Sequence, residues 1–127
     1  MGQEYLVEVI CDTSFLIHLA TKRIRNIDNI DVEIGPISFV VPDVVKNELA
    51  KLENIPEKKQ DIILTRNFIK NLKTIALPGN FADKEILDYV KSTKSIIGTM
   101  DKDLKKQVKI AGGSVLSFSN DKIVLES

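Results

Sequence analysis

The chain has one cysteine, no excess of charge and no long hydrophobic run, and each shortage excludes a class of protein. Its only cysteine, Cys11, allows neither an internal disulfide nor a cysteine-rich zinc site, and fits a reducing, cytoplasmic compartment. Lys and Arg total 18 and Asp and Glu total 18, so a net charge of zero gives no overall attraction to nucleic acid. No apolar run approaches the roughly 20 residues of a membrane span, and the first residues do not resemble a signal peptide, so we expect no membrane association.

Aromatic residues are also scarce. The five Phe and two Tyr fit mostly into a core, which leaves few rings for stacking on nucleic-acid bases. The rest of the composition, with 43% hydrophobic and 28% charged residues, is typical of a folded globular protein. A length of 127 residues is enough for one hydrophobic core, so we predict a single domain over residues 1–127.

Strands and helices are predicted to alternate along the chain. Apolar, β-branched runs predict strands at residues 5–11, 37–41, 73–77, 95–99, 115–118 and 123–125, with a hairpin turn at 119–122. Apolar residues at helical spacing predict a helix capped by Thr13 or Ser14, a short piece within residues 22–36, and helices at 43–54, 56–72, 83–93 and 101–111. Such alternation predicts a parallel sheet that is covered by helices on both faces.

Two features of the predicted helices can be checked directly. Asp43 is expected to cap the helix at 43–54 with its side chain. The apolar side of the helix at 56–72 is expected to consist of Ile62, Leu64, Phe68, Ile69 and Leu72.

Four acidic residues stand at the edges of these apolar segments. Asp12 directly follows the first strand, and Glu48 lies within the apolar stripe of the helix at 43–54. Asp83 and Asp101 each begin a helix whose apolar residues continue on the same face, so we expect all four carboxylates to point inward. Ligands bind at the carboxyl ends of neighbouring parallel strands, an arrangement that would bring Asp12 and Asp101 together.

A cluster of buried carboxylates repels itself, and a bound cation relieves that repulsion. Because clusters made only of oxygen ligands select hard cations, we expect Mg²⁺ or Mn²⁺ rather than zinc or copper. An acidic residue at a helix start can also act only as a cap, and this interpretation stays open for Asp83 and Asp101. It does not account for Glu48 in mid-helix or for Asp12 after a buried strand.

The order of these residues resembles that of the PIN-domain ribonucleases. The matching stretches, which together span nearly the whole chain, are residues 9–17 (VICDTSFLI), 40–49 (VVPDVVKNEL), 82–87 (ADKEIL), 97–104 (IGTMDKDL) and 113–118 (GSVLSF). The resemblance implies an α/β fold, namely a three-layer α/β/α domain with a mainly parallel central sheet. It also implies cleavage of single-stranded RNA by water that Mg²⁺ or Mn²⁺ activates.

The resemblance also assigns roles to individual residues. The acidic catalytic and metal-binding positions of the family correspond to Asp12, Glu48, Asp83 and Asp101, and an often acidic position corresponds to Asp103. Polar residues that support the site correspond to Thr13, Ser14 and Thr99. Many members have Asn at the position of Ser14 and a polar residue at that of Met100. These two departures bear on water positioning and rate more than on metal binding.

Basic residues supply candidate contacts to RNA phosphates. They are Lys22, Arg23 and Arg25 after the first helix, Lys59, Arg66 and Lys70 on the helix at 56–72, and Lys105 near the fourth acid. Each cluster can equally be a solvated face that nearby acids balance. Contacts to phosphates would make binding salt-sensitive and independent of sequence. His18 is expected to be structural or at the surface, and Cys11 to be a small core residue.

Three functions are compatible with the sequence. The first is a metal-dependent endoribonuclease acting on single-stranded or structured RNA, in the manner of the small archaeal proteins that resemble nucleases of ribosomal-RNA processing. The second is the toxin ribonuclease of a toxin–antitoxin pair, with an antitoxin as its partner. The third is a catalytically weak PIN domain that binds RNA or protein in an assembly such as one for ribosome maturation. The complete acidic set favours an enzyme.

Self-association is also expected. The helices at 43–54 and 56–72 carry more apolar residues than one sheet face needs, and Ile55, Ile63 and Leu64 are among the surplus. Apolar residues left over in this way commonly form contacts between copies, so we predict a homodimer.

Overall fold

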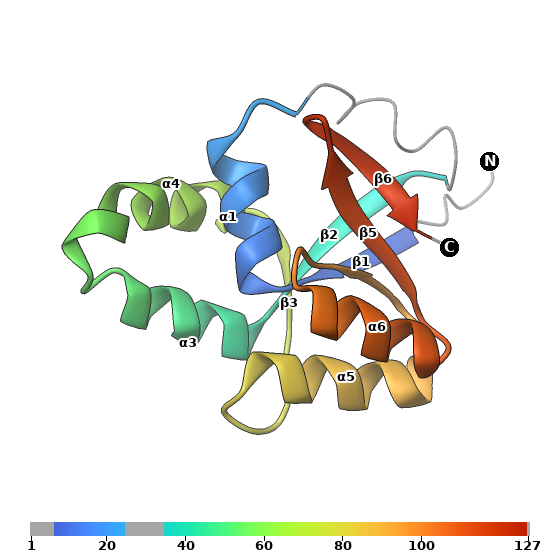
Figure 1. The fold of residues 1–127 in the computed structure, drawn as a ribbon. Helices are drawn as coiled ribbons and strands as arrows, with labels where there is room; N and C mark the ends of the chain where they lie inside the picture. The colour runs from blue at the N-terminus through green and yellow to red at the C-terminus, as the bar shows by residue number, and fades with distance from the viewer. Residues whose placement is uncertain (1–6, 25–34, 127) are drawn as a thin grey trace, which may run out of the picture.

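The sheet at the centre of the molecule has six strands in the order β3-β2-β1-β4-β5-β6 (Figure 1). The computed structural model describes residues 7–24 and 35–126. The strands are β1 (Val7–Cys11), β2 (Ile37–Pro42), β3 (Lys73–Ile75), β4 (Ile96–Gly98), β5 (Ser114–Ser119) and β6 (Lys122–Glu126). Neighbours from β3 to β5 pair in parallel, and β6 alone runs antiparallel, against β5.

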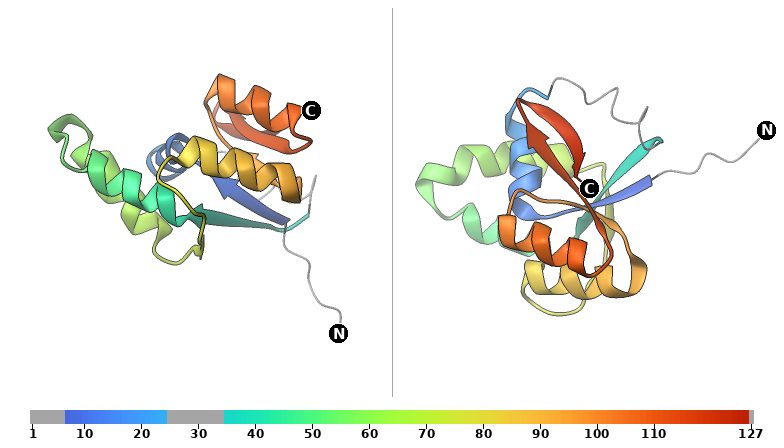
Figure 2. Two further views of the ribbon diagram at one scale, coloured as in Figure 1. Left: turned by 90° about the horizontal axis from the view of Figure 1, so that it is seen from below. Right: turned by 45° about the vertical axis from the view of Figure 1, so that its right-hand side comes forward.

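Helices connect the parallel strands and form a layer on each face of the sheet. They are α1 (Thr13–Thr21), α3 (Asp43–Leu52), the 3₁₀ turn η1 (Pro56–Lys58), α4 (Lys59–Ile69), α5 (Ala82–Thr93) and α6 (Lys102–Ile110). Because parallel crossovers are right-handed, α1, α3 and α4 cover one face and α5 and α6 the other. The pairs α1–α4 and α5–α6 pack side by side, as Figure 2 also shows. The predicted three-layer α/β/α fold is therefore confirmed.

The core is built around β1, which lies between β2 and β4. Val9, Ile10 and Cys11 at the end of this strand are buried, as expected for a central parallel strand with helices on both faces. Phe15 at the start of α1 is equally buried and lies against the backbone of Gly98, where a Cβ atom would approach its ring to 2.9 Å. The close contact brings the beginning of α1 to the end of β4.

The predicted elements agree with the observed ones to within a few residues, but their caps differ. Asp12, rather than Thr13 or Ser14, caps α1. Asp43 does not cap α3: it is the first helical residue after Pro42, and its Oδ1 accepts a hydrogen bond from the backbone N–H of Leu77 at 3.1 Å. Its carboxylate therefore fastens the segment after β3 instead of closing its own helix.

The apolar side predicted for α4 is partly wrong. Ile62 and Ile69 are buried as expected, but Leu64 and Phe68 are exposed, and Thr65 takes a place in the core between the two isoleucines. The Thr65 hydroxyl donates to the carbonyl of Asp61 at 2.8 Å, which satisfies its polar group without a partner outside the helix.

Two further expectations concern the hairpin and the membrane. The predicted turn between β5 and β6 is confirmed, since Asn120 and Asp121 have φ values of 52° and 62°, as a tight hairpin turn requires. In the described residues, no helix has the length and apolar character to cross a membrane. Of the short piece predicted within residues 22–36, positions 25–34 lie outside the described residues.

Candidate active site

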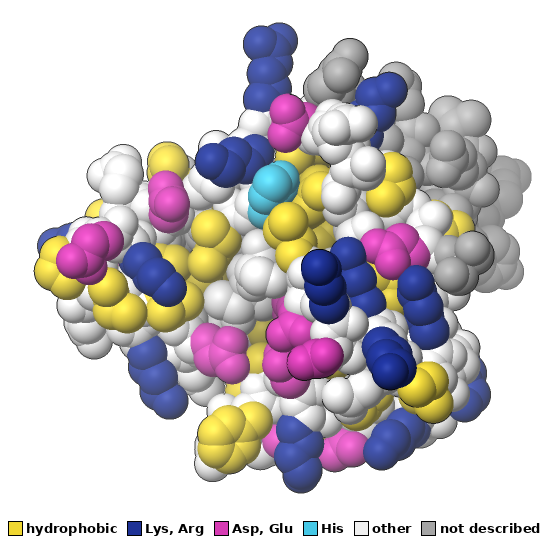
Figure 3. Space-filling view, viewed as in Figure 1, with side chains coloured by type: hydrophobic (Ala, Val, Ile, Leu, Met, Phe, Trp, Pro, Cys, Tyr) yellow, Lys and Arg dark blue, Asp and Glu magenta, His cyan; other side chains and the backbone are white. Residues whose placement is uncertain are grey.

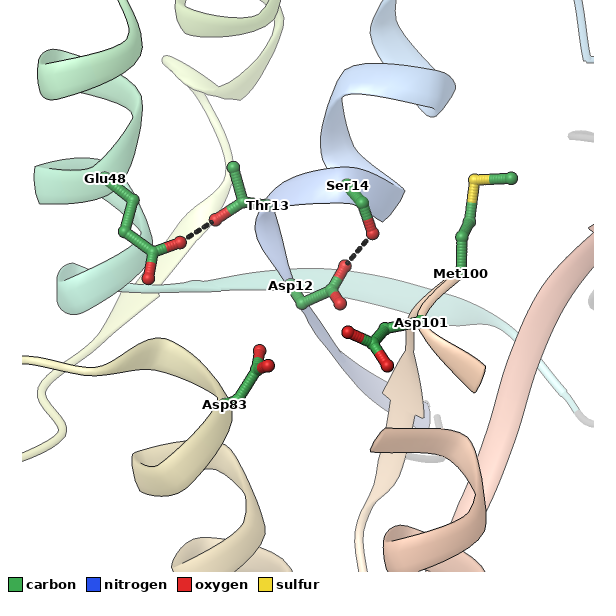
Figure 4. Close-up of a pocket in the computed structure, with 7 residues that line it drawn as sticks. All are labelled: Asp12, Thr13, Ser14, Glu48, Asp83, Met100 and Asp101. Atoms are coloured by element: carbon green, nitrogen blue, oxygen red, sulfur yellow. Dashed lines mark hydrogen bonds between the residues drawn. The ribbon is translucent and has the colours of Figure 1, made fainter. Parts of the chain in front are cut away.

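A cleft of about 360 Å³ opens beyond the carboxyl ends of β1 and β4 (Figure 4). These strands are neighbours, and the strand order reverses between them, which is where open parallel sheets bind ligands. The residues that line the cleft are Asp12, Thr13, Ser14, Glu48, Asp83, Met100 and Asp101. The fold thus brings the four predicted carboxylates to one place from the starts of three helices and the middle of a fourth.

Asp12 lies deepest in the cleft, with only 4% of its surface exposed. Its Oδ1 accepts hydrogen bonds from the backbone N–H of Phe15 at 2.8 Å and from the Ser14 hydroxyl at 3.0 Å. Its Oδ2 accepts a hydrogen bond from the hydroxyl of Thr99. Burial raises the pKa of Asp12 above its ordinary value, and these hydrogen bonds, that of Thr99 first, oppose the rise.

Glu48 is half-buried on the second turn of α3 and joins three helices. Its Oε1 accepts from the Thr13 hydroxyl at 2.5 Å, and its Oε2 accepts from the backbone N–H of Ala82 at 3.3 Å. One carboxylate thereby connects α3 to the first residues of α1 and of α5. These contacts hold its head group at the cleft, as Figure 4 shows.

Asp83 and Asp101 line the cleft, and Figure 4 shows their carboxylates turned toward it, but both residues are exposed at its rim rather than buried. The spacing of apolar residues gives the side of a helix but not how far its first turn extends past the sheet. Asp101 also caps α6, because its Oδ1 accepts from the backbone N–H of Asp103 and of Leu104. Asp83 makes no capping hydrogen bond, so the cap interpretation applies to Asp101 only.

The charges in the cleft influence one another. The pKa of Asp83 is raised first by its partial burial, and then by the negative charges of Asp101 and Glu48. Thr99, which is buried, connects two of the acids: its hydroxyl donates to Asp12 and accepts from the backbone N–H of Asp101 at 3.0 Å. The arrangement concentrates negative charge in a small volume and fixes its deepest member.

The donor set fits a hard cation in chemistry, because every charged ligand in the cleft is a carboxylate oxygen. Across residues 7–24 and 35–126, no three acidic, histidine or cysteine side chains are spaced to hold an ion as they stand. Repulsion between carboxylates favours such separation, and Asp83 and Asp101 are exposed rather than fixed by burial. Asp103 lies outside this cleft and lines a neighbouring one with Asp83 and Lys84.

Comparison with known proteins identifies the family. Residues 9–120 match the model of the PIN like domain. This chain belongs to the PIN domain family. It is 31% identical over 113 residues to "Ribonuclease VapC4" of Methanocaldococcus jannaschii, which covers 81% of this chain and 83% of that relative.

Solved structures agree with this assignment. The PIN domain endonuclease Utp24 has a TM-score of 0.74 and 28% identity, over 94% of this chain and 90% of that one. A domain of a functionally unknown protein from M. jannaschii has a TM-score of 0.53 at 18% identity, over 89% and 91%, and supports the fold alone. Since one relative is named a ribonuclease and one an endonuclease, the PIN domain described here is supported as a nuclease.

The predicted basic residues of this PIN domain are scattered. Lys22, Arg23, Lys59, Arg66 and Lys70 are exposed, whereas Arg25 lies outside the described residues. Arg66 and Lys70 line a second cleft, between α3 and α4. Lys46 also lines it, although the sequence analysis had not singled out this residue. Two of the predicted basic residues already form ion pairs. A guanidinium nitrogen of Arg66 lies 2.6 Å from a carboxylate oxygen of Glu53, and the Nζ of Lys105 lies 2.9 Å from a carboxylate oxygen of Glu126.

Lysines of α6 other than Lys105 also lie near the cleft. Figure 3 shows Lys and Arg side chains gathered over this helix beside the acidic side chains of the cleft. Lys102 and Lys106 are exposed there, one and five residues after Asp101. Lys106 was expected near Asp101 from the sequence, whereas Lys102 was not singled out. They are the cations on α6 that no ion pair within the described chain occupies.

Neither remaining reactive side chain lines the cleft. Cys11 is buried, and burial raises the pKa of its thiol, which makes it a poor nucleophile. His18 packs against Phe118 with 4.2 Å between ring centroids, and partial burial lowers its pKa. Both positions accord with the structural roles expected from the sequence.

Proposed function

We propose that this PIN domain is a metal-dependent endoribonuclease that hydrolyses phosphodiester bonds of single-stranded RNA. The observation that carries the proposal is the convergence of Asp12, Glu48, Asp83 and Asp101 on one cleft at the switch point of the sheet. A cluster of acids repels a phosphate, so a site for binding alone would gain nothing from it. With a divalent cation the same cluster becomes useful for phosphodiester chemistry.

The four carboxylates would hold one or more Mg²⁺ or Mn²⁺ ions, with Asp12 and Asp101 as the central ligands. A bound ion lowers the pKa of its water and stabilises the charge that develops on the phosphate. The hydroxyls of Thr13, Ser14 and Thr99 orient carboxylates, since the first donates to Glu48 and the other two to Asp12. Asp103, outside the cleft, is the weakest candidate ligand.

Asp83 is the best candidate for accepting the proton of the attacking water. It is exposed, it makes no capping hydrogen bond, and its pKa is raised toward the working range of a general base. Its position at the rim leaves its oxygens accessible to water on the substrate side of the cleft.

The RNA backbone would follow lysines and arginines around the cleft. Lys102 and Lys106 on α6 follow Asp101 in the sequence. Lys46, Arg66 and Lys70 line the second cleft, which lies between α3 and α4. Contacts of this kind are to phosphates, so binding should be independent of sequence and weaken steeply with salt.

The biological role is part of the same proposal. The role proposed first is processing of ribosomal RNA, with RNA and a ribosome-assembly factor as partners. The names of the relatives, a ribonuclease and a PIN domain endonuclease, support cleavage of a nucleic acid but not a particular substrate. The alternatives are a toxin ribonuclease that an antitoxin restrains, and a catalytically weak RNA- or protein-binding module. The exposed apolar residues Ile55, Ile63 and Leu64 on the α3–α4 hairpin support the proposed homodimer.

The decisive experiment is cleavage of a labelled single-stranded RNA in Mn²⁺ or Mg²⁺ by the wild type and by Asp12→Asn, Asp83→Asn and Asp88→Asn. Asp88 lies on α5 with Asp83 but outside the cleft, so its variant is a matched control. Asparagine at position 12 can still accept from Phe15 and Ser14, so the fold should survive. We expect losses of about 100-fold or more for the first two variants and none for the third. Equal activity of all four proteins would refute the site.

A further inference from the structure

Phe81 is an aromatic side chain that the fold leaves in water. It is 71% exposed, whereas the buried ring of Phe15 packs against those of Phe39 and Phe118. Phe81 immediately precedes α5 and stands two positions before Asp83. Phe81 is thus an exception to the expectation that most aromatic residues belong to the core. A large apolar side chain held in solvent forgoes the stabilisation that burial would give.

The backbone that carries Phe81 is fastened on both sides. Gly79 has a φ of +95°, and a Cβ atom there would lie 2.0 Å from a carboxylate oxygen of Glu85, which is buried beneath the loop. The carbonyl of Phe81 accepts from the backbone N–H of Glu85 at 3.0 Å. The next N–H, that of Ala82, donates to Glu48 at 3.3 Å. The ring is therefore exposed from an ordered segment that contacts a carboxylate of the cleft.

The surroundings of Phe81 are polar. Asn80, Asp83 and Lys84 next to it are polar and exposed, and Pro78 is another exposed apolar residue of the loop, so the ring does not belong to a broad apolar patch. In Figure 3, hydrophobic atoms over the loop that leads into α5 lie below the acidic side chains of the cleft, on the same face of the molecule. Ile55, Ile63 and Leu64, the exposed apolar residues that support the proposed dimer, lie instead between α3 and α4 and on α4.

We infer that Phe81 stacks on an unpaired nucleobase of the RNA strand whose phosphate enters the carboxylate cleft. This inference rests on the proposed ribonuclease function and adds a recognition element to it. Every nucleobase has an apolar face that an exposed ring can cover, and stacking of this kind tolerates any sequence. In a duplex those faces are covered by neighbouring bases, so the contact selects single strands.

Electrostatics gives the contact a purpose. Glu48, Asp83 and Asp101 repel the phosphate backbone at the point where it must be cut. An uncharged aromatic surface next to them attracts the strand without adding positive charge that would compete with a cation for the carboxylates. A lone ring also requires no complementary protein surface, which favours a base over a protein partner.

The absence of tryptophan makes the test direct. The chain contains no Trp, so Phe81→Trp introduces a single fluorophore at the proposed contact. We would titrate Asp12→Asn/Phe81→Trp with a short single-stranded RNA, with the same RNA carrying abasic sites, and with a duplex. Strong quenching by the intact strand, with little from the abasic strand or the duplex, is expected. An unchanged spectrum with the intact strand overturns the inference, and so does a spectrum that changes with protein concentration alone.

Binding by further variants separates stacking from general apolar contact. In the Asp12→Asn background, Phe81→Ala and Phe81→Leu should each weaken single-strand binding about tenfold, and Phe81→Tyr should retain it. Ile110→Ala removes an equally exposed apolar side chain at the end of α6 and should change nothing. Full affinity in Phe81→Leu would overturn the inference. Cleavage by the wild type is read separately: cutting without quenching refutes only the stacking, and quenching without cutting refutes only the proposed nuclease.

Discussion

Replacing Thr99 with valine removes one hydroxyl from the floor of the cleft and nearly nothing else. The two side chains have almost the same shape, and Thr99 is buried, so the new methyl group occupies the place of the oxygen. That oxygen serves two groups: it donates to Asp12 and accepts from the backbone N–H of Asp101. The substitution therefore separates the polar connection between the two acids from the packing around it.

The size of the effect follows from these two hydrogen bonds. A hydrogen bond to a charged group contributes about 1.5–3 kcal/mol to stability and one between neutral groups about 1 kcal/mol. Asp12 lines the cleft, where water can replace part of the lost donation. We therefore expect Thr99→Val to lower the free energy of unfolding by about 2 kcal/mol, somewhat less than the combined range of about 2.5–4 kcal/mol. For a chain of this length that corresponds to a fall in Tm of about 6–10 °C.

The same substitution should change how stability and cleavage rate depend on pH. Burial already raises the pKa of Asp12 above 3.8, and the Thr99 hydrogen bond opposes the rise, so Thr99→Val raises the pKa further. In metal-free protein, an acid whose pKa is higher in the folded state than in the unfolded chain contributes stability, and this contribution is complete at pH values below the unfolded-chain pKa. That stability is lost as the pH rises through the folded pKa. The variant should lose it over a wider pH range, and the acid limb of its cleavage rate should move to higher pH.

Urea unfolding at several pH values and cleavage rates across the same range would measure both effects. Thr99→Ser, which keeps the hydroxyl and loses only a methyl group, is the matched control and should follow the wild-type pH profile. A Thr99→Val protein within about 0.5 kcal/mol of the wild type, with an unshifted pH profile, would show that the hydroxyl does not support Asp12.

Other predictions concern the rest of the fold. The Ser117 hydroxyl and Lys105 lower the pKa of Glu126 to about 2, so Glu126→Gln should destabilise the protein in urea at pH 7, by an amount that shrinks as pH falls from 4.5 toward 2. Gly79→Ala must adopt a φ of +95° against a buried carboxylate and should lower the free energy of unfolding in urea by about 1–3 kcal/mol, whereas no change would mean that the loop is adaptable. Leu64→Lys should shift sedimentation from dimer to monomer, and an unaltered mass would place the contact elsewhere.

The sequence alone predicted that Asp12 and Asp101 lie together, because residues that follow parallel neighbouring strands meet at one edge of the sheet. Asp12 and Asp101 each follow a strand, and parallel neighbouring strands end at the same edge of a sheet. Glu48 was found because a carboxylate within an apolar stripe needs a polar partner, which Thr13 supplies. The family resemblance gave the fold as a whole, and the observed sheet order agrees with it.

What the sequence did not reveal depends on distances between elements. Helical spacing placed Asp83 on the apolar side of α5, but only the packed structure shows that its first turn extends past the sheet into solvent. The same limit explains α4, where Thr65 rather than Leu64 faces the core. Phe81 escaped notice because a phenylalanine in a short loop has no periodic pattern from which exposure can be inferred.

The four carboxylates of the cleft come from the starts of α1, α5 and α6 and from the middle of α3, so no short segment of the chain contains the set. During synthesis Asp101 emerges last, and it reaches Asp12 only after β4 has paired beside β1. A domain of this size folds as a unit, so a growing or truncated chain lacks the assembled cleft. Under the proposed function, such a chain cannot cut the messenger from which it is being translated. The dispersed site would thus restrain the nuclease until the segment that carries Asp101 has been made and packed beside β1.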